Sequence, residues 1–416
     1  MPIDFTPLDT ASRLLVEAEL KVATGGGGRF QPTGFPNLGP ALFRGADGTN
    51  WLLVESFQSM ANRLELASWD EAAERYDEVC HGIPFVRSTV TLRGGATATT
   101  SSVQESHRLA SPYILDGRLR ANRNGTEQER RLWEELKDAQ SPRTLGLQDN
   151  IPFLLRNHAG RLLRLDAGSL LHGVWLSTKV EPDGRKRKAL CGGKIRFPRM
   201  LSAVIEAKEP QTANSGGVKR ERIMDQAESG STDAESGFGS VPFPRTDFTS
   251  PEIKAYFSFD LQLLRTCALG SRTEQEQDGR IRRVPASQVL TQPHNQSNFT
   301  DEEAFLILWA LYKIKRFLTG SMALRSGCTF KEGSLSCQEP SSFSLPTFEE
   351  IHSELISLRQ HLFQRATDNT VDPARDNITT VSWQGEVPIA AADTAPHESG
   401  GEDAGNEGVP EGGGDA

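Results

Sequence analysis

The sequence has few cysteines, and their spacing does not suggest a covalent or metal-binding framework. The 416 residues include five cysteines, an odd number, and no two of them form a Cys-x-x-Cys pair. The pattern therefore indicates neither a disulfide scaffold nor a zinc site. We expect the protein to work in a reducing cytoplasm.

Long apolar segments are also missing. No stretch reaches the roughly 18 apolar residues that a membrane-spanning helix needs, and the first residues lack the basic region and apolar core of a signal peptide. We therefore expect no membrane partner. Hydrophobic residues make up only 37% of the chain, which indicates long polar insertions or tails around a modest core.

Motifs of the common enzyme classes are absent as well. The glycine run at residues 25–28 lacks the Gly-Lys-Ser/Thr ending of a phosphate loop. No Glu-x-x-His or His-x-x-x-His spacing involves His107, His158 or His172, and no Gly-x-Ser-x-Gly nucleophile elbow occurs. We expect no catalytic site, no metal and no cofactor, and interpret these histidines as hydrogen-bond donors in a polar groove.

Charge is distributed unevenly along the chain. The formal net charge is −9, but residues 384–416 carry eight acids and no Lys or Arg, so the rest carries only −1. This segment is rich in Gly, Ala, Glu and Pro, and we expect a disordered acidic tail. Between Arg185 and Arg222, by contrast, eleven Lys and Arg accompany three Glu. That segment is a candidate polyanion-binding region, although a solvated loop is an open alternative.

Hydrophobic periodicity predicts an α+β core that carries long polar insertions. Val16, Ala18 and Leu20 alternate with polar residues, as on a half-buried strand. Capping boxes begin helices after Thr300 and Thr347. The expected strands are 14–22, 52–56, 85–92, 200–207, 255–261 and 322–330, the expected helices are 58–67, 301–318 and 347–364, and a charged helical stretch is expected at 127–139. Polar insertions are expected at 116–150, 208–250 and 271–299.

Three short runs combine rigid backbone with Arg, amide and hydroxyl groups. In residues 29–39, two prolines and two glycines define a loop that carries Arg29, Gln31 and Thr33. Residues 58–63 and 106–112 have a similar composition. A fourth run, residues 194–199, places cations on either side of a Phe ring, as in grooves that follow a single-stranded nucleic acid backbone.

These runs give the chain a resemblance to a known family. Residues 29–39, 53–65, 100–115, 169–174, 195–207, 241–261 and 324–328 resemble, in the same order, the CRISPR-associated RAMP protein of type I-U (I-G) systems. This is that subtype's member of the seventh-Cas-subunit family, which forms the Cascade backbone. The resemblance covers about residues 10–335. The glycine run, the Arg185–Lys188 cluster and the acidic tail depart from the family pattern.

The resemblance implies an RNA-recognition-type, ferredoxin-like palm with large finger and thumb insertions. Residues 1–383 would form a single RAMP-type unit, followed by the tail at 384–416. The strands at 14–22, 200–207, 254–261 and 322–330 and the helix at 301–318 would build the palm. Fingers would lie within 23–198, and the thumb would be 208–252.

The function implied is structural and not enzymatic. Members of the family bind guide RNA, polymerise along it and present it to target DNA within an interference complex. The partners would be guide RNA, target DNA, further copies of the chain and other subunits of the complex. The candidate RNA contacts are Arg29, Gln31, Thr33, Gln58, Asn62, Arg63, Ser102, His107, Arg108, His172, Arg196, Arg199, Lys219 and Arg220.

Two alternatives are open at this point. Type III relatives of the family cut RNA with a thumb aspartate, and Asp225, Asp233 and Asp247 lie in the candidate thumb, so an RNA endonuclease is the first alternative. A small-molecule enzyme of unknown class is the second, although the sequence contains no acid pair, metal set or cofactor loop that would support it.

Overall fold

The computed structural model describes residues 3–384 except 36–37, 93–94, 124–125, 148–151, 177–194, 221–239, 271–272, 276–280, 284–296 and 364–376. The predicted acidic tail, apart from Gln384, lies outside these residues, as does the Arg185–Lys188 cluster.

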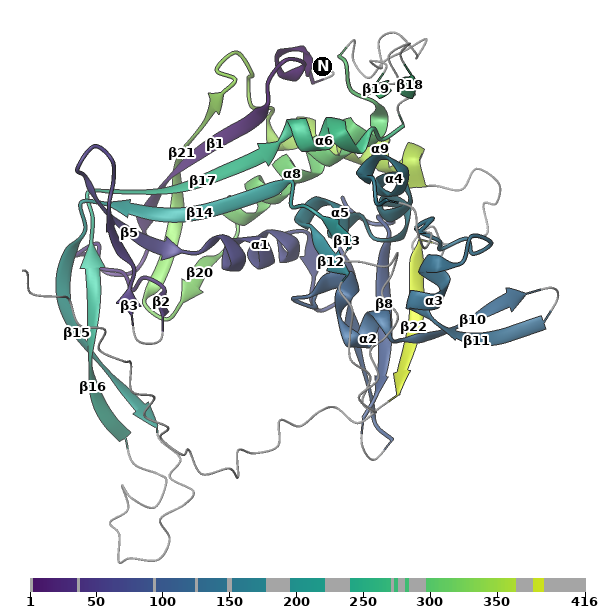
Figure 1. The fold of residues 1–416 in the computed structure, drawn as a ribbon. Coiled ribbons are helices and arrows are strands. Elements are labelled where there is room, and N and C mark those ends of the chain that lie inside the picture. Colours follow the sequence, from purple (N-terminus) through teal and green to yellow (C-terminus); the bar gives the residue numbers. More distant parts are fainter. Residues whose placement is uncertain are drawn as a thin grey trace, which may run out of the picture.

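A seven-stranded antiparallel sheet forms the centre of the molecule (Figure 1). Its order is β20-β21-β1-β17-β14-β5-β4, with β1 Arg13–Val22, β4 Leu42–Arg44, β5 Asn50–Glu55, β14 Leu201–Lys208, β17 Glu252–Asp260, β20 Met322–Arg325 and β21 Cys328–Glu339. Buried and half-buried residues alternate along β17 because successive side chains point to opposite faces of the sheet.

Helices cover the buried side of this sheet. They are α1 Phe57–Leu66, α6 Leu261–Cys267, α8 Asp301–Thr319 and α9 Phe348–Phe363. α1 packs on β14, α8 packs on β17, β20 and β21, and α9 packs on α8. α8 is buried almost all round because it lies between the sheet and α9, and its predicted capping box joins Thr300 and Glu303. Among the described helices, none has the length and apolar composition to cross a membrane.

A second sheet of five strands has the order β11-β10-β22-β8-β9. Its strands are β8 Phe85–Thr91, β9 Thr97–Ser101, β10 Arg118–Arg123, β11 Thr126–Arg131 and β22 Ile378–Gln384. β22 pairs with β8 in parallel, with Ile378 opposite Phe85 and Gln384 opposite Thr91. This sheet therefore joins two segments that are far apart in the chain.

Short elements link the two sheets or extend from them. The helical ones are η1 Thr6–Leu8, η2 Arg108–Ala110, α2 Pro112–Leu115, α3 Leu132–Lys137, α4 Leu155–Leu165 and α5 Ala167–His172. The short strands pair as β2 Gly34–Phe35 with β3 Gly39–Pro40, β6 Trp69–Asp70 with β7 Arg75–Tyr76, β12 Val174–Leu176 with β13 Ile195–Phe197, and β18 Thr273–Gln275 with β19 Ile281–Arg283.

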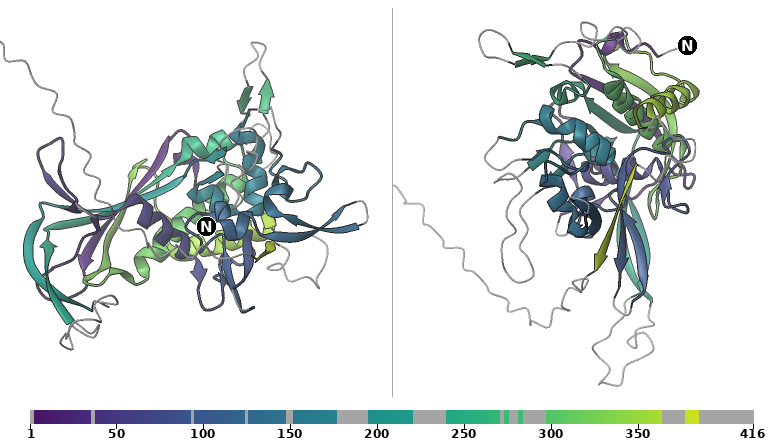
Figure 2. Two further views of the ribbon diagram at one scale, coloured as in Figure 1. Left: turned by 60° about the horizontal axis from the view of Figure 1, so that its bottom comes forward. Right: turned by 90° about the vertical axis from the view of Figure 1, so that its right-hand side faces the viewer.

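A long hairpin, β15 Gln211–Arg220 with β16 Ser240–Thr249, lies between β14 and β17 in the chain. Figure 2 shows an elongated molecule with this hairpin at one end and the β10–β11 hairpin at the other. In Figure 1, β15–β16 and the five-stranded sheet project to the same side of the seven-stranded sheet, with α1 between them.

One hydrophobic core connects the two sheets. Its junction is an aromatic cluster in which the ring of Tyr76 lies edge-on to Trp69, Phe85 and Trp309, with centroids 5.5, 5.5 and 5.6 Å away. Edge-to-face pairs of this kind are favourable because the positive ring edge meets the negative ring face. The cluster fixes the five-stranded sheet, through Phe85, to α8, through Trp309.

The structure confirms most predicted elements and corrects two. The predicted strand at 322–330 is two strands, β20 and β21, joined at Gly327, whose φ of +75° suits glycine. The charged stretch at 127–139 is not one helix, because 126–131 pair with β10 and only Leu132–Lys137 is helical. The α+β class is confirmed.

Candidate nucleic-acid interface

A groove of about 1090 Å³ lies between α1, the segment from Ser106 to Pro112, the end of α5, and the β12–β13 hairpin. These elements lie next to one another near the centre of Figure 1. The groove gathers half of the predicted contact residues from four separate parts of the sequence, namely Gln58, Asn62, His107, Arg108, His172, Arg196 and Arg199.

Arg199 holds two walls of the groove together. Its guanidinium donates to Gln58 Oε1 at 3.0 Å, to the Phe57 carbonyl at 3.3 Å and to the His172 carbonyl at 3.3 Å. Gln58 in turn donates to Asn62 at 3.4 Å, one turn further along α1. Gln58 and Asn62 therefore present their amides on one helix face, in an orientation fixed by Arg199 from the segment between β13 and β14.

Trp175 and Arg196 form a platform at the mouth of the groove. They are directly opposite each other on β12 and β13, and the Arg196 guanidinium lies 5.8 Å from the Trp175 ring centroid. Trp175 remains 51% exposed, although its neighbours Val174 and Leu176 are buried. An exposed indole beside a cation is suited to stacking a nucleobase and holding a phosphate.

Trp175 is absent from the predicted contacts. The signal that could have indicated it is the alternation Val174-Trp175-Leu176, which places an indole on the outer face of a strand. Three residues are too few for that pattern to be recognised without knowing that Arg196 lies opposite.

Arg108 was expected to be an exposed RNA contact, but the structure places its side chain in the interior. Its side chain is only 8% exposed and donates to both carboxylate oxygens of Glu65 at 2.6 Å, and to the Gly173 carbonyl at 3.2 Å. A cation engaged in this way supports the wall of the groove, and its donors are already used within the protein. Its exposed neighbour His107 does line the groove.

Ser102 and His172 are also buried, at 2% and 1% exposure, which places their side chains poorly for the predicted RNA contacts. The Ser102 hydroxyl accepts a hydrogen bond from the Val86 amide at 3.1 Å. Among the described residues, neither ring nitrogen of His172 finds a hydrogen-bond partner. Burial, together with the charges of Lys313, Arg108 and Arg199, holds the pKa of His172 well below its ordinary value. His172 is therefore neutral and contributes shape, not charge.

Burial makes the Glu65 carboxyl sensitive to pH. It raises the pKa of Glu65 from 4.5 to about 7, an effect that Arg108 only partly offsets. Because the folded state then retains a proton that the unfolded chain releases, this group should make the protein less stable as pH rises from about 4.5 to 7.

Urea unfolding of the wild type and of Glu65→Gln across this range should isolate that contribution. We expect the free energy of unfolding of the wild type, relative to that of Glu65→Gln, to fall as pH rises from about 4.5 to 7. His172 is the same in both proteins, so its contribution cancels from the difference. A difference independent of pH would contradict the assignment.

Arg29, Gln31, Thr33 and Arg63 lie outside the groove, near the β20–β21 turn. The backbone of Gln31 bonds to Gly327 and Arg325, and the Thr33 amide donates to Val54 at 2.9 Å. Arg63 is engaged with the Leu324 carbonyl at 2.6 Å and with Glu55 at 3.5 Å. The predicted rigid loop is therefore fixed to the seven-stranded sheet, and its exposed cation is Arg29, at 54%.

The β15–β16 hairpin carries two further predicted contacts and one candidate catalyst. Lys219 and Arg220 lie opposite Val241 and Ser240 near the far end of the described hairpin. Asp247 is 2% exposed and is paired with Arg245 at 2.9 Å and Arg29 at 3.5 Å. A buried, doubly paired carboxylate is poorly placed to bind a catalytic metal. Asp225 and Asp233 lie outside the described residues.

Comparison with known proteins identifies the family. The family model described as CRISPR-associated protein GSU0053 matches residues 14–211, from β1 to the first residue of β15. This range contains every wall of the groove. No curated protein sequence matches the chain. The matched family, CRISPR-associated protein GSU0053, is a RAMP family of the type I-U systems, and this match over residues 14–211 agrees with the resemblance seen in the sequence.

Proposed function

We propose that this protein is a guide-RNA-binding backbone subunit of a type I CRISPR interference complex. The observation that carries the proposal is the groove, in which Arg196, His107 and Gln58 are exposed beside the half-exposed Trp175. Cations for phosphates and a ring for bases are what sequence-tolerant binding of a single strand requires. The family match over residues 14–211 supports the same role.

The proposal assigns the parts of the fold to the parts of a RAMP protein. β1, β14, β17 and the β20–β21 hairpin, with α8, would be the ferredoxin-like palm. The β15–β16 hairpin would be the thumb, and the elements within residues 23–198, completed by β22, would be the fingers. Several copies would polymerise along one guide in the cytoplasm and present it, with other subunits, to target DNA.

We propose no catalytic step. The thumb aspartate that the structure describes, Asp247, is buried between two arginines. Within the described residues, no group of three or more His, Cys, Asp or Glu side chains could hold a metal ion. The groove offers cations, amides and a ring, which are suited to binding a polyanion.

Guide-RNA affinity should fall steeply with salt. If each copy neutralises about six phosphates, the slope of log K against log salt should be roughly −4, since each phosphate of a single strand contributes about −0.7. Fluorescence anisotropy with a labelled guide at several salt concentrations measures this slope. An affinity that does not change with salt would refute the proposal.

The same experiment can be extended to the backbone role. Purification with a co-expressed guide array should give RNA-containing assemblies whose masses differ by whole copies of the 45.6 kDa chain. An RNA-free monomer under the same conditions would contradict polymerisation.

A further inference from the structure

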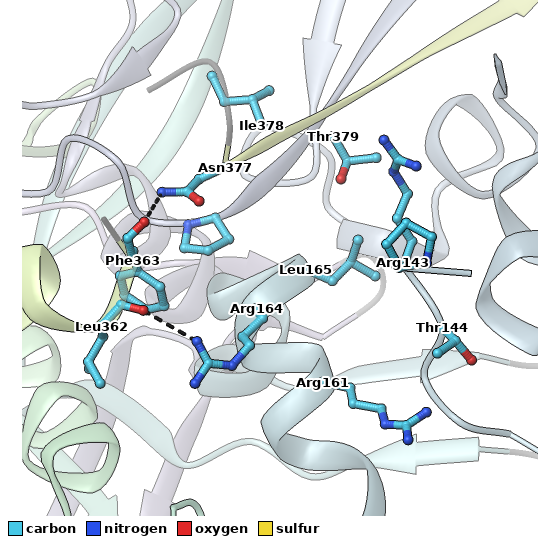
Figure 3. Close-up of a pocket in the computed structure, with 12 residues that line it drawn as sticks. Arg143, Thr144, Arg161, Arg164, Leu165, Leu362, Phe363, Asn377, Ile378 and Thr379 are labelled. Carbon is cyan, nitrogen blue, oxygen red and sulfur yellow. Dashed lines mark hydrogen bonds between the residues drawn. The ribbon is translucent and has the colours of Figure 1, made fainter. Parts of the chain in front are cut away.

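A second, smaller pocket lies apart from the groove and shares no lining residue with it. It measures about 490 Å³ and lies between the loop at 142–144, α4, the end of α9 and the start of β22 (Figure 3). Its lining includes three apolar side chains, Leu165, Phe363 and Ile378. Neither the family match nor the proposed RNA groove accounts for it.

Three arginines line this pocket, and two of them lack a partner. Within the described part of the chain, the guanidinium groups of Arg143 and Arg161 take part in no hydrogen bond or ion pair. Arg164 donates to the Leu362 carbonyl at 3.3 Å and lies 3.7 Å from Glu302, with 60% of its side chain exposed. The pocket therefore has an excess of positive charge in a concave, partly apolar setting. Such a site favours an anionic ligand with some apolar character.

The position of Arg161 depends on a glycine. Gly146 has a φ of +71°, and a Cβ at this position would lie 2.4 Å from Arg161 Nη1. The guanidinium thus lies directly against the backbone, in space that any other residue would occupy. Figure 3 shows Arg161 and Arg164 both projecting from the α4 side of the pocket.

The same chain contains a segment of complementary charge that begins nearby in sequence. Residues 385–416 hold eight acids, no Lys or Arg, and scattered Val, Ile and Ala. They follow β22, whose first residues, Ile378 and Thr379, line the pocket. β22 ends at Gln384, about 20 Å from its start at roughly 3.3 Å per residue.

The segment is long enough to return to the pocket. Asp393 is nine residues beyond Gln384, a reach of about 30 Å when extended, and five of the acids lie between Asp393 and Glu407. Attachment to the same chain would raise the effective concentration of the segment to the millimolar range. Weak individual Arg–carboxylate contacts would then be sufficient.

We propose that the pocket of Arg143, Arg161 and Arg164 binds the acidic segment 385–416 of the same chain. This contact has a consequence that rests on the proposed function. A free polyanion would compete with RNA for the cations of the groove, whereas a segment bound in the pocket would not. The pocket keeps the chain's own negative charge away from its RNA site.

Direct binding can be measured without RNA. The receptor is the full-length protein in which the eight acids of residues 385–416 are changed to Asn or Gln, and the probe is a synthetic peptide of the natural segment. Isothermal titration should show saturable binding that weakens with salt. Arg143→Glu with Arg161→Glu should weaken it at least tenfold, while Arg118→Glu with Arg120→Glu, a pair on the exposed face of β10, should not.

Either of two results would overturn the proposal. One is the absence of peptide binding, and the other is binding that the Arg143 and Arg161 changes leave intact. Thermal unfolding of each variant checks that the substitutions have not affected folding. Because this arm contains no RNA, its outcome does not depend on the proposed function.

A second arm uses RNA and tests the consequence. In the natural chain, Arg143→Glu with Arg161→Glu should release the segment and weaken guide-RNA binding several-fold. In the chain with the neutralised segment, the same two changes should have no effect. An equal loss in both backgrounds would mean that the pocket itself binds RNA phosphates, which contradicts the proposal. If no variant binds RNA, the proposed function fails while the peptide arm still decides the contact.

Discussion

Replacing Arg108 by alanine should lower the free energy of unfolding by about 3–5 kcal/mol at pH 8, the range for breaking a buried ion pair by removing one partner. Arg108 makes a bidentate contact with Glu65, which is 4% exposed. Without the guanidinium, the carboxylate must either remain charged in the interior or take up a proton. Either outcome raises the free energy of the folded state and leaves that of the unfolded chain unchanged.

The neighbouring groups cannot replace Arg108. Lys313 is fully buried nearby, but its ammonium donates to the carbonyls of Leu64 and Glu65 and to Ser68 Oγ, at 2.9–3.2 Å. Burial lowers the pKa of Lys313 to about 8, so it is itself partly neutral at this pH. The backbone at Arg108 has a φ of +53°, but alanine has the same Cβ, so this strain is unchanged.

Urea unfolding provides the measurement, and two variants provide the controls. Arg108→Met combined with Glu65→Leu removes both charges and should recover most of the lost stability, because an apolar pair of similar volume needs no partner. Arg63→Ala removes a half-buried arginine of α1 that contacts Glu55 and the Leu324 carbonyl. This substitution should lower the free energy of unfolding by less than Arg108→Ala does. A loss below about 1 kcal/mol for Arg108→Ala would show that the pair contributes little.

The second large effect concerns RNA. Changing Trp175 and Arg196 together to alanine should weaken guide-RNA binding by at least thirtyfold, because one base stacked on an aromatic ring is worth about 1–3 kcal/mol and the cation adds a phosphate contact. Both side chains are on the outer face of the β12–β13 hairpin. Stability should therefore change little.

Anisotropy titrations at constant salt test this expectation. The matched control is Phe43→Ala with Arg120→Ala, an exposed ring and an exposed arginine that do not line the groove. Loss of affinity in the control alone would place RNA elsewhere on the molecule. For a guide that carries abasic nucleotides, Arg196→Ala should still weaken binding, whereas Trp175→Ala should hardly change the affinity.

Most of the central sheet could be predicted from the sequence because its strands have a buried and an open face. Residues 13–22 and 252–260 alternate in hydrophobicity, and residues 13–19 pair with 254–260. The β20–β21 hairpin was harder, since its turn consists of one glycine after a serine and the strands on both sides are partly polar. The charged stretch at 126–131 suits a helix by composition, and only pairing with β10 makes it a strand.

The candidate site could be predicted as a set of residues, but not as a geometry. Gln58, His107 and Arg199 were found from their residue types and the family pattern, and the fold brings them to one groove. The sequence could not separate His107, which is exposed, from Arg108, which is buried, because the 3₁₀ turn that orients them has no distinctive pattern. Trp175 became recognisable only when Arg196 was seen opposite it.

The pairing of β22 with β8 also determines when the protein can finish folding. During synthesis, β8 appears almost three hundred residues before its partner, since Phe85 pairs with Ile378. Until the ribosome has released residues 378–384, one edge of β8 has unpaired amides and carbonyls, and such an edge is prone to pairing with other chains. The groove residues up to Arg199 emerge much earlier, so nascent chains can hold the complete set of groove residues beside a sheet that is still incomplete.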